Sequence, residues 1–505
     1  MMENMLKGPN NKLLRKVILA SSAGTMIEWY DFYIFGSLAT ILSTQFFPKE
    51  NPAAAFLFTL AAFGVGFVIR PFGAIVFGRL GDMIGRKYTF LVTLLLMGGS
   101  TFAIGLIPGY ETIGVFAPVI VFLLRAVQGL ALGGEYGGAA IYVAEHAPAG
   151  RKGFFTSFIQ TTATLGLFIS LAVILSCKAL MSANDFTAWG WRIPFLVSIF
   201  LVIVSYYIRK RMEESPVFTE LKVQGRVSKN PLRESFGNKA NLRLVLLALF
   251  GATAGQGVVW YTGQFYAMNF CIKNLNIDAA QVQWLLIPVL LIGTPLFIFF
   301  ASLSDRVGRK WIMLTGIGLA ALSYYPVYKG MAAQAQPSGW GATGWGDEQR
   351  QANAAGDSTS VLTLKYPNGA KQVIKTETTK AKDFKDVKKT STLYLPASNL
   401  FNIGLLIFLQ LVFVAMAYGP IAAFLVELFP VHIRYTSLSL PYHIGNGVFG
   451  GLTPLIAESL VQRTGNIFAG LWYPIAIAAI TALIGIFFLK SKYAGDGDRA
   501  VEAGK

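Results

Sequence analysis

The stretch Gly78-Arg-Leu-Gly-Asp82-Met-Ile-Gly85-Arg86-Lys87 has a second copy later in the chain, Ala301-Ser-Leu-Ser-Asp305-Arg-Val-Gly308-Arg309-Lys310. Both copies share the pattern Leu-x-Asp-x-x-Gly-Arg-Lys, and each follows a long apolar block. A second pair of matching segments is Glu145-His-Ala-Pro148-Ala-Gly-Arg151 and Glu427-Leu-Phe-Pro430-Val-His-Ile-Arg434. Two independent correspondences predict that the chain consists of two halves with the same architecture.

The composition places this repeat in a membrane. Of the 505 residues, 54% are apolar and 14% are charged, whereas soluble proteins average about 45–50% and about 25%. A helix needs roughly 20 apolar residues to cross a bilayer. Twelve blocks of that kind are present: 17–41, 55–78, 88–107, 114–145, 152–176, 190–208, 242–271, 280–303, 310–328, 399–427, 433–461 and 466–490. We therefore expect an all-α integral membrane protein with twelve transmembrane helices in two six-helix pseudo-symmetric bundles, related by an axis along the membrane normal.

The blocks and the polar segments between them divide the chain. We expect the first apolar block to be retained as a spanning helix, because no small-residue cleavage site interrupts it. The predicted organisation is 1–208 N-terminal bundle, 209–241 cytoplasmic linker, 242–328 first part of the C-terminal bundle, 329–398 extracytoplasmic insertion, 399–490 rest of that bundle, and 491–505 cytoplasmic tail.

The basic residues predict an orientation. If both termini are cytoplasmic, that side holds 26 Lys and Arg, against 4 in the short loops of the other side. Cytoplasmic loops of membrane proteins carry this excess. We expect a multi-pass protein of the plasma membrane, most simply a bacterial inner membrane. The net charge of +17 is then explained by topology and lipid headgroups, and no nucleic-acid partner is expected.

Two polar segments interrupt the pattern. Residues 330–356 are small and polar, and we expect them to be disordered. Residues 361–366 and 370–375 flank a Pro-Asn-Gly turn and predict a β-hairpin, to which 393–395 adds a third strand. We interpret this small β-rich outer insertion as inert rather than gating or partner-binding. For 209–241, a plain linker is favoured over one short surface helix.

The repeated loop suggests a mechanical role. Gly85 and Gly308 permit a tight turn, and Asp82 and Asp305 are placed to accept hydrogen bonds from a helix N-terminus in the opposite half. Such contacts would close the inner face. The alternative is a generic basic turn with a solvated Asp. Glu145 and Glu427 are interpreted as partners of Arg86 and Arg309. The full candidate gating set is Asp82, Arg86, Glu145, Arg151, Asp305, Arg309, Glu427 and Arg434.

Several segments carry a family resemblance: Gly24-Thr-Met-Ile-Glu28-Trp-Tyr-Asp31-Phe-Tyr33, Arg70-Pro-Phe-Gly73, Arg125-Ala-Val-Gln128-Gly-Leu-Ala-Leu-Gly-Gly134-Glu135-Tyr-Gly-Gly138, Trp191-Arg192-Ile-Pro-Phe195 and Glu427-Leu-Phe-Pro430. With the loop 78–87, the chain resembles the major facilitator superfamily. Within it, the chain is similar to the metabolite:proton symporter family, which carries proline/betaine, shikimate, citrate and 2-oxoglutarate. The insertion 329–398 and His443 depart from the family pattern.

Acids in an apolar block point to proton chemistry, because an ionisable group at mid-bilayer costs roughly 2.5–3.5 kcal/mol on insertion scales. Gly24, Glu28 and Asp31 share one helix face. Two carboxylates so close in a low dielectric do not ionise together readily, which suits a proton carrier. The alternative is that one of them pairs with a buried Arg. We assign proton coupling to Glu28, Asp31 and Glu135, without choosing between the first two.

The candidate substrate-binding residues lie in three apolar blocks. Arg125 and Gln128 share the fourth block, and the resemblance implies that Arg125 faces a central cavity and binds a substrate carboxylate. A permanent buried ion pair is equally consistent. Polar and aromatic groups in the seventh and eleventh blocks complete the set, although interhelical hydrogen bonding explains them nearly as well: Gln256, Trp260, Gln264, Tyr442, His443 and Asn446.

These features predict a proton-coupled symporter that imports a small organic acid or zwitterion by alternating access. The alternatives are a proton-independent uniporter, or a transport-inactive sensor or scaffold that uses the insertion to bind a partner. An enzyme is disfavoured, because the sequence shows no metal cluster, nucleophile elbow or phosphate loop. The expected partners are a small-molecule substrate, protons and the bilayer. No cofactor or metal is expected, and we expect a monomer.

Overall fold

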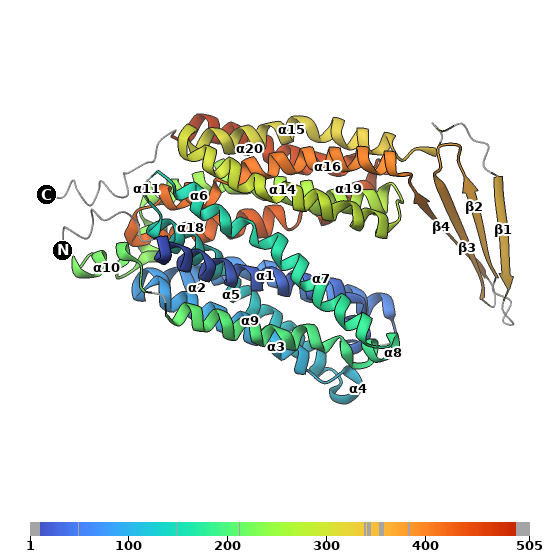
Figure 1. Cartoon of the computed structure of the whole chain (residues 1–505), viewed down its shortest axis with the longest axis horizontal. Coiled ribbons are helices and arrows are strands. Elements are labelled where there is room, and N and C mark those ends of the chain that lie inside the picture. The colour runs from blue at the N-terminus through green and yellow to red at the C-terminus, as the bar shows by residue number, and fades with distance from the viewer. Residues whose placement is uncertain are drawn as a thin grey trace.

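The chain folds into two helical bundles with a small β-sheet at one end (Figure 1). In this computed structural model, residues 11–48, 50–148, 150–211, 213–337, 340, 345–352, 358–381 and 384–490 are described. We call the end that holds the turns at Gly85 and Gly308 the basal end, and the opposite end, which carries the sheet, the sheet end. Both turns have a positive φ, 123° and 108°, which only glycine adopts without strain.

The N-terminal half contains the first six spans. Their elements, with the short helices between them, are α1 (Asn11–Phe46), α2 (Pro52–Ile84), α3 (Arg86–Leu106), α4 (Tyr110–Ile113), α5 (Phe116–His146), α6 (Lys152–Gln160), α7 (Thr162–Leu180), α8 (Ala183–Asp185), η2 (Phe186–Gly190) and α9 (Arg192–Lys210). The linker to the second half includes α10 (Pro216–Val223) and the π-helical turn η3 (Arg233–Gly237).

The C-terminal half repeats this arrangement. Its seventh span contains several π-helical turns: α11 (Lys239–Ala248), η4 (Leu249–Thr253), α12 (Ala254–Tyr261), η5 (Thr262–Tyr266), α13 (Ala267–Asn269) and η6 (Phe270–Asn274). The remaining elements are α14 (Ala279–Val307), α15 (Arg309–Ala333), α16 (Ala397–Tyr418), α17 (Ile421–Leu428), η8 (Val431–Ile433), α18 (Arg434–His443), η9 (Ile444–Gly450), α19 (Thr453–Thr464), η10 (Ala469–Leu471) and α20 (Trp472–Phe488).

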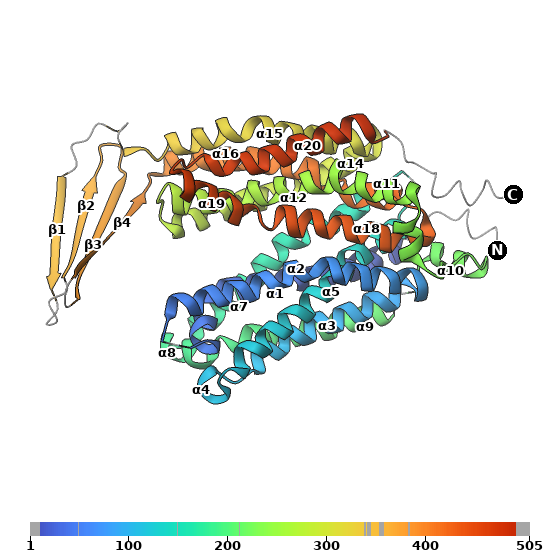
Figure 2. The ribbon, with the colours of Figure 1, turned by 180° about the vertical axis from the view of Figure 1, so that it is seen from behind.

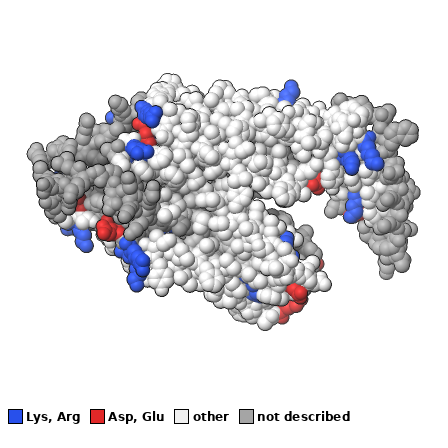
Figure 3. Space-filling model, viewed as in Figure 1, with Lys and Arg blue, Asp and Glu red and all other residues white. Residues whose placement is uncertain are grey.

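The helical spans fit a bilayer. Among the described residues, 10 helices are long and apolar enough to cross a membrane. The helices α1 and α15, with 36 and 25 residues, run alongside them (Figures 1 and 2). On the face seen in Figure 3, charged residues gather toward the two ends and leave a broad uncharged band between them. The predicted all-α membrane fold with two six-helix bundles is confirmed.

The two halves are in contact at the basal end and separate toward the sheet end. In both ribbon views α18 lies against α2 and α5, and the space-filling view shows an open notch between the halves that faces the sheet (Figures 1 to 3). The notch between the halves therefore opens toward the sheet end.

The insertion between α15 and α16 is a four-stranded antiparallel meander in the order β1-β2-β3-β4. Its strands are β1 (Trp345–Ala352), β2 (Ser358–Lys365), β3 (Lys371–Ala381) and β4 (Phe384–Tyr394). The last strand attaches the sheet to the C-terminal half, because the backbone of Leu393 bonds to that of Asn276 and Asp278 and the side chain of Gln281 bonds to the backbone of Leu395.

Three sequence interpretations need correction. Disorder over 330–356 is wrong in part, because α15 continues to Ala333 and β1 occupies Trp345–Ala352; the rest of that segment lies mostly outside the described residues. The predicted hairpin is present, but the sheet has four strands, not three. The favoured plain linker is also wrong, since Ser215 caps α10 through a bond from the Phe218 amide.

Close packing of α2 against α5 depends on glycine. A Cβ added to Gly133 would lie 2.3 Å from the Arg70 carbonyl oxygen, whereas a Cβ on Gly36 of α1 would meet nothing within 4 Å. We expect Gly133→Ala to destabilise the protein by about 1–3 kcal/mol through overpacking, and Gly36→Ala to be neutral or slightly stabilising. Thermal unfolding in detergent measures both. Equal melting temperatures for the two variants would contradict this account of the packing.

Candidate functional site

Asp31 of α1 belongs to a compact polar cluster inside the N-terminal half. Its Oδ2 lies 3.0 Å from Arg125 Nη1, and its Oδ1 accepts a hydrogen bond of 2.9 Å from Gln128 Nε2. Gln128 also donates to Thr101 of α3 at 2.9 Å, and the Arg125 guanidinium lies over the ring of Phe35. For Arg125, the structure therefore shows a buried ion pair in this conformation, one of the two readings left open by the sequence.

Glu28 faces a different arginine. Its Oε1 lies 3.7 Å from Arg70 Nη1 of α2, with 8% of the Glu28 side chain and 12% of the Arg70 side chain exposed. The two acids of α1 thus do not share a proton between themselves in this conformation. His443 of α18 interacts electrostatically with Arg70 and contacts the main chain of Gly133, so this second pair is at the boundary between the halves.

Polar atoms at this boundary are left without protein partners. Arg70 Nε and His443 Nε2 are buried and have no hydrogen-bond partner among the described residues. Native proteins pair nearly all such atoms, and each exception needs an explanation. The Glu28–Arg70 pair, at 3.7 Å, is likewise longer than a direct hydrogen bond. An acceptor group such as a carboxylate placed here would supply partners for these nitrogen atoms.

Aromatic side chains from both halves meet around this position. Trp29 of α1 and Trp260 of α12 have ring centroids 5.2 Å apart, and Phe32 and Phe265 are 5.8 Å apart. Trp29 and Phe32 follow Glu28 along α1 toward the sheet end, and Trp260 and Phe265 lie in α12 and η5. We infer from this placement that they separate the polar site from the notch above it.

A second aromatic contact joins α5 to α18. Tyr136 and Tyr442 stack at a centroid distance of 3.6 Å and an interplanar angle of 2°. The Tyr442 hydroxyl is 2.9 Å from that of Tyr418, and Gln160 Nε2 donates to Tyr136 Oη at 2.7 Å. The predicted residue Tyr442 therefore connects the halves through a stacked ring and a short hydroxyl chain.

The predicted polar stripe on the seventh span is only partly formed. Gln256 and Asn446 exchange two hydrogen bonds, of 3.1 and 3.0 Å, between α12 and η9. Gln264 is half-buried and lies in the π-helical turn η5. A π-helical turn changes the rotation per residue, so four-residue spacing no longer keeps Gln264 on the face of Gln256 and Trp260.

Glu135 is held inside the N-terminal half. Its Oε1 accepts from Arg209 Nη2 at 2.5 Å, and its Oε2 accepts from Thr93 at 3.0 Å. Arg209, which the sequence places at the start of the linker 209–241, lies in the last turn of α9, is 1% exposed and also donates to the Phe90 carbonyl. Gly24 leaves the room for this pair, because a Cβ there would overlap the guanidinium.

The basal contacts follow the repeat. Asp82 accepts hydrogen bonds from the backbone N–H groups of Tyr435 and Thr436, at 3.1 and 2.8 Å, where α18 begins. Asp305 accepts from those of Gly153 and Phe154, at 2.9 and 2.8 Å, where α6 begins. Each half thus holds a helix N-terminus of the other with a carboxylate, which is the contact that the sequence predicted.

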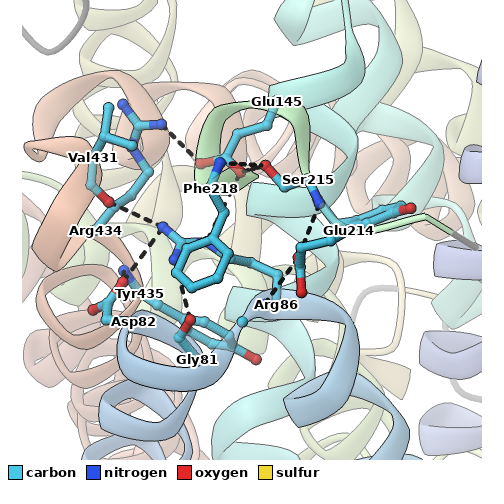
Figure 4. A network of polar contacts seen from close by, with 12 residues as sticks. Gly81, Asp82, Arg86, Glu145, Glu214, Ser215, Phe218, Val431, Arg434 and Tyr435 are labelled. Carbon is cyan, nitrogen blue, oxygen red and sulfur yellow. Dashed lines mark hydrogen bonds and ion pairs between the residues drawn. The ribbon is translucent and has the colours of Figure 1, made fainter. Parts of the chain in front are cut away.

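Arg86 is the centre of the network in Figure 4. It donates to the carbonyl oxygens of Gly81 and Val431, at 3.1 and 2.9 Å, and lies 3.4 Å from Asp82. Glu145, its expected partner, is 3.8 Å from Arg86 but only 3.0 Å from Arg434. Four of the candidate gating residues are therefore assembled across the two halves.

The equivalent cluster in the other half is simpler. Arg309 lies 2.6 Å from Asp305 and 2.9 Å from Glu427. Arg151, the remaining member of the predicted set, is exposed and lies over the rings of Phe154 and Phe155. The structure gives it no ion pair among the residues that are described.

Sequence reasoning missed the linker and Tyr435. Glu214 accepts from the backbone amides of Arg86 and Lys87, and Ser215 donates to Glu145 (Figure 4). The Tyr435 ring fills a slot lined by glycines and donates to the Gly134 carbonyl at 2.6 Å. The signals were present: Ser-Pro at 215–216 is a helix start, and paired glycines at 133–134 and 137–138 mark close packing.

Two six-helix halves that meet around a polar site at mid-depth and close at one end are the architecture of a secondary transporter. The comparisons with known proteins agree. The family model "Sugar (and other) transporter" matches residues 16–242. The chain is 32% identical to the inner membrane metabolite transport protein YhjE of Escherichia coli, over 93% of this chain and 92% of that protein.

Other relatives carry related names. The shikimate transporter of Escherichia coli is 29% identical over 93% of this chain and 94% of its own length, and the glycine betaine/proline/ectoine/pipecolic acid transporter OusA of Dickeya dadantii is 30% identical over 94% and 83%. Among solved structures, the proton:xylose symporter XylE superposes with a TM-score of 0.67 at 16% identity, covering 95% of this chain and 97% of that one.

The chain belongs to the major facilitator superfamily, within its metabolite, shikimate and proline/betaine transporters. It is a membrane transporter and not an enzyme.

We expect Asp82→Asn combined with Asp305→Asn to open the basal end. Each replacement removes a negative charge from a helix N-terminus, where it contributes about 0.3–2 kcal/mol. Spin labels at the exposed positions Ile84 and Val307, one in each half, should report longer distances in the double variant.

The matched control is Asp278→Asn. Asp278 also caps a helix N-terminus, accepting from the Gln281 amide at 3.0 Å, but within one half. Its replacement should leave the distance between the labels unchanged. An unchanged distance in the double variant as well would mean that the two carboxylates do not close the basal end.

Proposed function

We propose that this protein is a proton-coupled symporter, acting as a monomer, which imports a small organic acid or zwitterion by alternating access. The observation that carries the proposal is the Glu28–Arg70 pair at the boundary of the halves, beside His443, with buried nitrogen atoms of Arg70 and His443 left unpaired. A carboxylate-bearing substrate would satisfy those nitrogen atoms.

The proposed coupling depends on the long distance between Glu28 and Arg70, which makes their contact weak. Protonation of Glu28 would remove its charge and release Arg70 to bind a substrate carboxylate. Arg70 Nη1 is already 3.7 Å from Glu28 Oε1, so little interaction is lost when the partner changes. When the substrate leaves, Arg70 again favours ionised Glu28. The proton is then released on the same side of the membrane as the substrate.

Asp31 and Glu135 have structural roles in this proposal. Asp31 is bonded to Arg125 and Gln128, and both oxygens of Glu135 are bonded within the N-terminal half. Removing one partner of such a buried pair leaves an uncompensated charge, at a cost of about 3–5 kcal/mol. Glu28 lacks comparable contacts, which makes it the better carrier of the two α1 acids.

The remaining candidate residues would line the substrate path. Trp260 contacts Trp29 of α1, the Gln256–Asn446 pair lies within the C-terminal half, and Tyr442 stacks on Tyr136 of the other half. Rocking of the halves would break the bonds of Asp82 and Asp305 to the helix N-termini and close the notch at the sheet end. The basal end is proposed to face the cytoplasm of a bacterial inner membrane, in line with the 26 to 4 distribution of basic residues.

The coupling is tested in vesicles with an imposed inward proton gradient. Radiolabelled shikimate, proline and betaine are the first substrates to offer, because relatives are named for them. We expect accumulation of at least one substrate above equilibrium, abolished by an uncoupler. Gradient-independent equilibration would instead identify a uniporter, and no movement of any organic acid or zwitterion would favour the sensor or scaffold.

Glu28→Gln tests the assigned carrier. The variant should lose uphill accumulation but retain exchange of substrate across the membrane, because the amide cannot deliver a proton while Arg70 stays free to bind. Asp31→Asn should lose both activities and part of its thermal stability, because Arg125 is left with a neutral partner. Normal accumulation by Glu28→Gln would place the coupling proton elsewhere.

A further inference from the structure

A groove on the outside of the C-terminal half is separate from the transport site. It has a volume of about 420 Å³ and lies between α11 and the end of α20, near the basal end. Its walls include Leu246, Phe250, Ile484 and Phe488, and two basic residues, Lys239 and Arg243, stand at its rim. Apolar exposure alone is ordinary on a membrane-facing surface, but a concave site with two cations is not.

The order of residues along α11 gives the groove a polar and an apolar part. Lys239, Arg243 and Leu246 are spaced by four and three residues, so they follow one face of α11 from its basal start, and Phe250 of η4 lines the same groove beyond them. Beyond Phe250, η4 and α20 pack tightly against each other, because a Cβ on Gly485 would lie 2.7 Å from the Gly251 carbonyl oxygen.

The charges of Lys239 and Arg243 are unpaired in the part of the chain that the structure describes. Within the described parts of the chain, neither Lys239 nor Arg243 has an ion-pair or hydrogen-bond partner, and both are exposed. Two other basic residues near this end do have partners. Lys310 donates to the Ile486 and Leu489 carbonyls at the end of α20, and Arg434 pairs with Glu145. Two unpaired positive charges above an apolar wall complement an anionic headgroup attached to an acyl chain.

We propose that this groove binds an anionic phospholipid, with its phosphate between Lys239 and Arg243 and an acyl chain along Leu246, Phe250 and Phe488. The tail 491–505, which follows α20, complements the site less well. It contains three Lys or Arg and three Asp or Glu, and only five apolar residues. A soluble anion has no use for the apolar wall.

The experiment is native mass spectrometry of the full chain with added phosphatidylglycerol. We expect one tightly bound phosphatidylglycerol, and Lys239→Gln combined with Arg243→Gln should weaken it about thirtyfold, from roughly 1 kcal/mol per basic residue. The matched control, Lys222→Gln with Arg226→Gln, removes two exposed basic residues of the linker and should leave the lipid bound. Leu246→Trp keeps both charges but fills the groove, and should also release the lipid.

Several results would overturn the proposal. They are equal retention of phosphatidylglycerol by the wild type and the Lys239/Arg243 variant, equal binding of phosphatidylcholine, displacement of the lipid by inorganic phosphate, or retention by Leu246→Trp. A chain shortened at Lys490 that binds lipid when the full chain does not would identify the tail as the occupant instead. None of these results depends on whether transport is coupled to protons.

Discussion

The structure depends on carboxylates that hold helix N-termini across a boundary. Asp82 and Asp305 each accept two backbone hydrogen bonds from the first turn of a helix in the opposite half. A helix start offers unpaired N–H groups and a partial positive charge, so one side chain satisfies both needs. These contacts join two bundles that also meet through the Glu145–Arg434 ion pair and through side-chain packing.

Buried charge organises the N-terminal half in the same way. Three acids of this half, Glu28, Asp31 and Glu135, each face an arginine from another helix. The pairs differ in how fully they are satisfied. Asp31 and Glu135 have short bonds on both oxygens, whereas the contact of Glu28 is longer and lies at the boundary with α18. In the proposed mechanism, Asp31 and Glu135 stabilise the bundle and Glu28 is the acid that changes its partner.

Much of this arrangement was predictable from the sequence, and the exceptions have physical causes. The spans follow from hydropathy, and a motif that occurs twice indicates that Asp82 and Asp305 each bond to a helix N-terminus of the opposite half. The burial of Arg209 was not predictable, because a basic residue at the end of a span normally points to the headgroups, and only the packing of α1, α3 and α5 around Glu135 decides otherwise. Strand β1 has no alternating apolar pattern and is held by backbone pairing with β2.

The attachment of the β-sheet has a practical consequence. Backbone bonds join Leu393 to Asn276 and Asp278, and Gln281 bonds to Leu395, so these contacts attach the sheet to the C-terminal bundle and break the likeness of the two repeats. Small helical membrane proteins are hard to align in electron micrographs because little protrudes from the micelle. This sheet projects from one end (Figure 2), and it supplies a built-in fiducial that reports the orientation of its own half in every particle image.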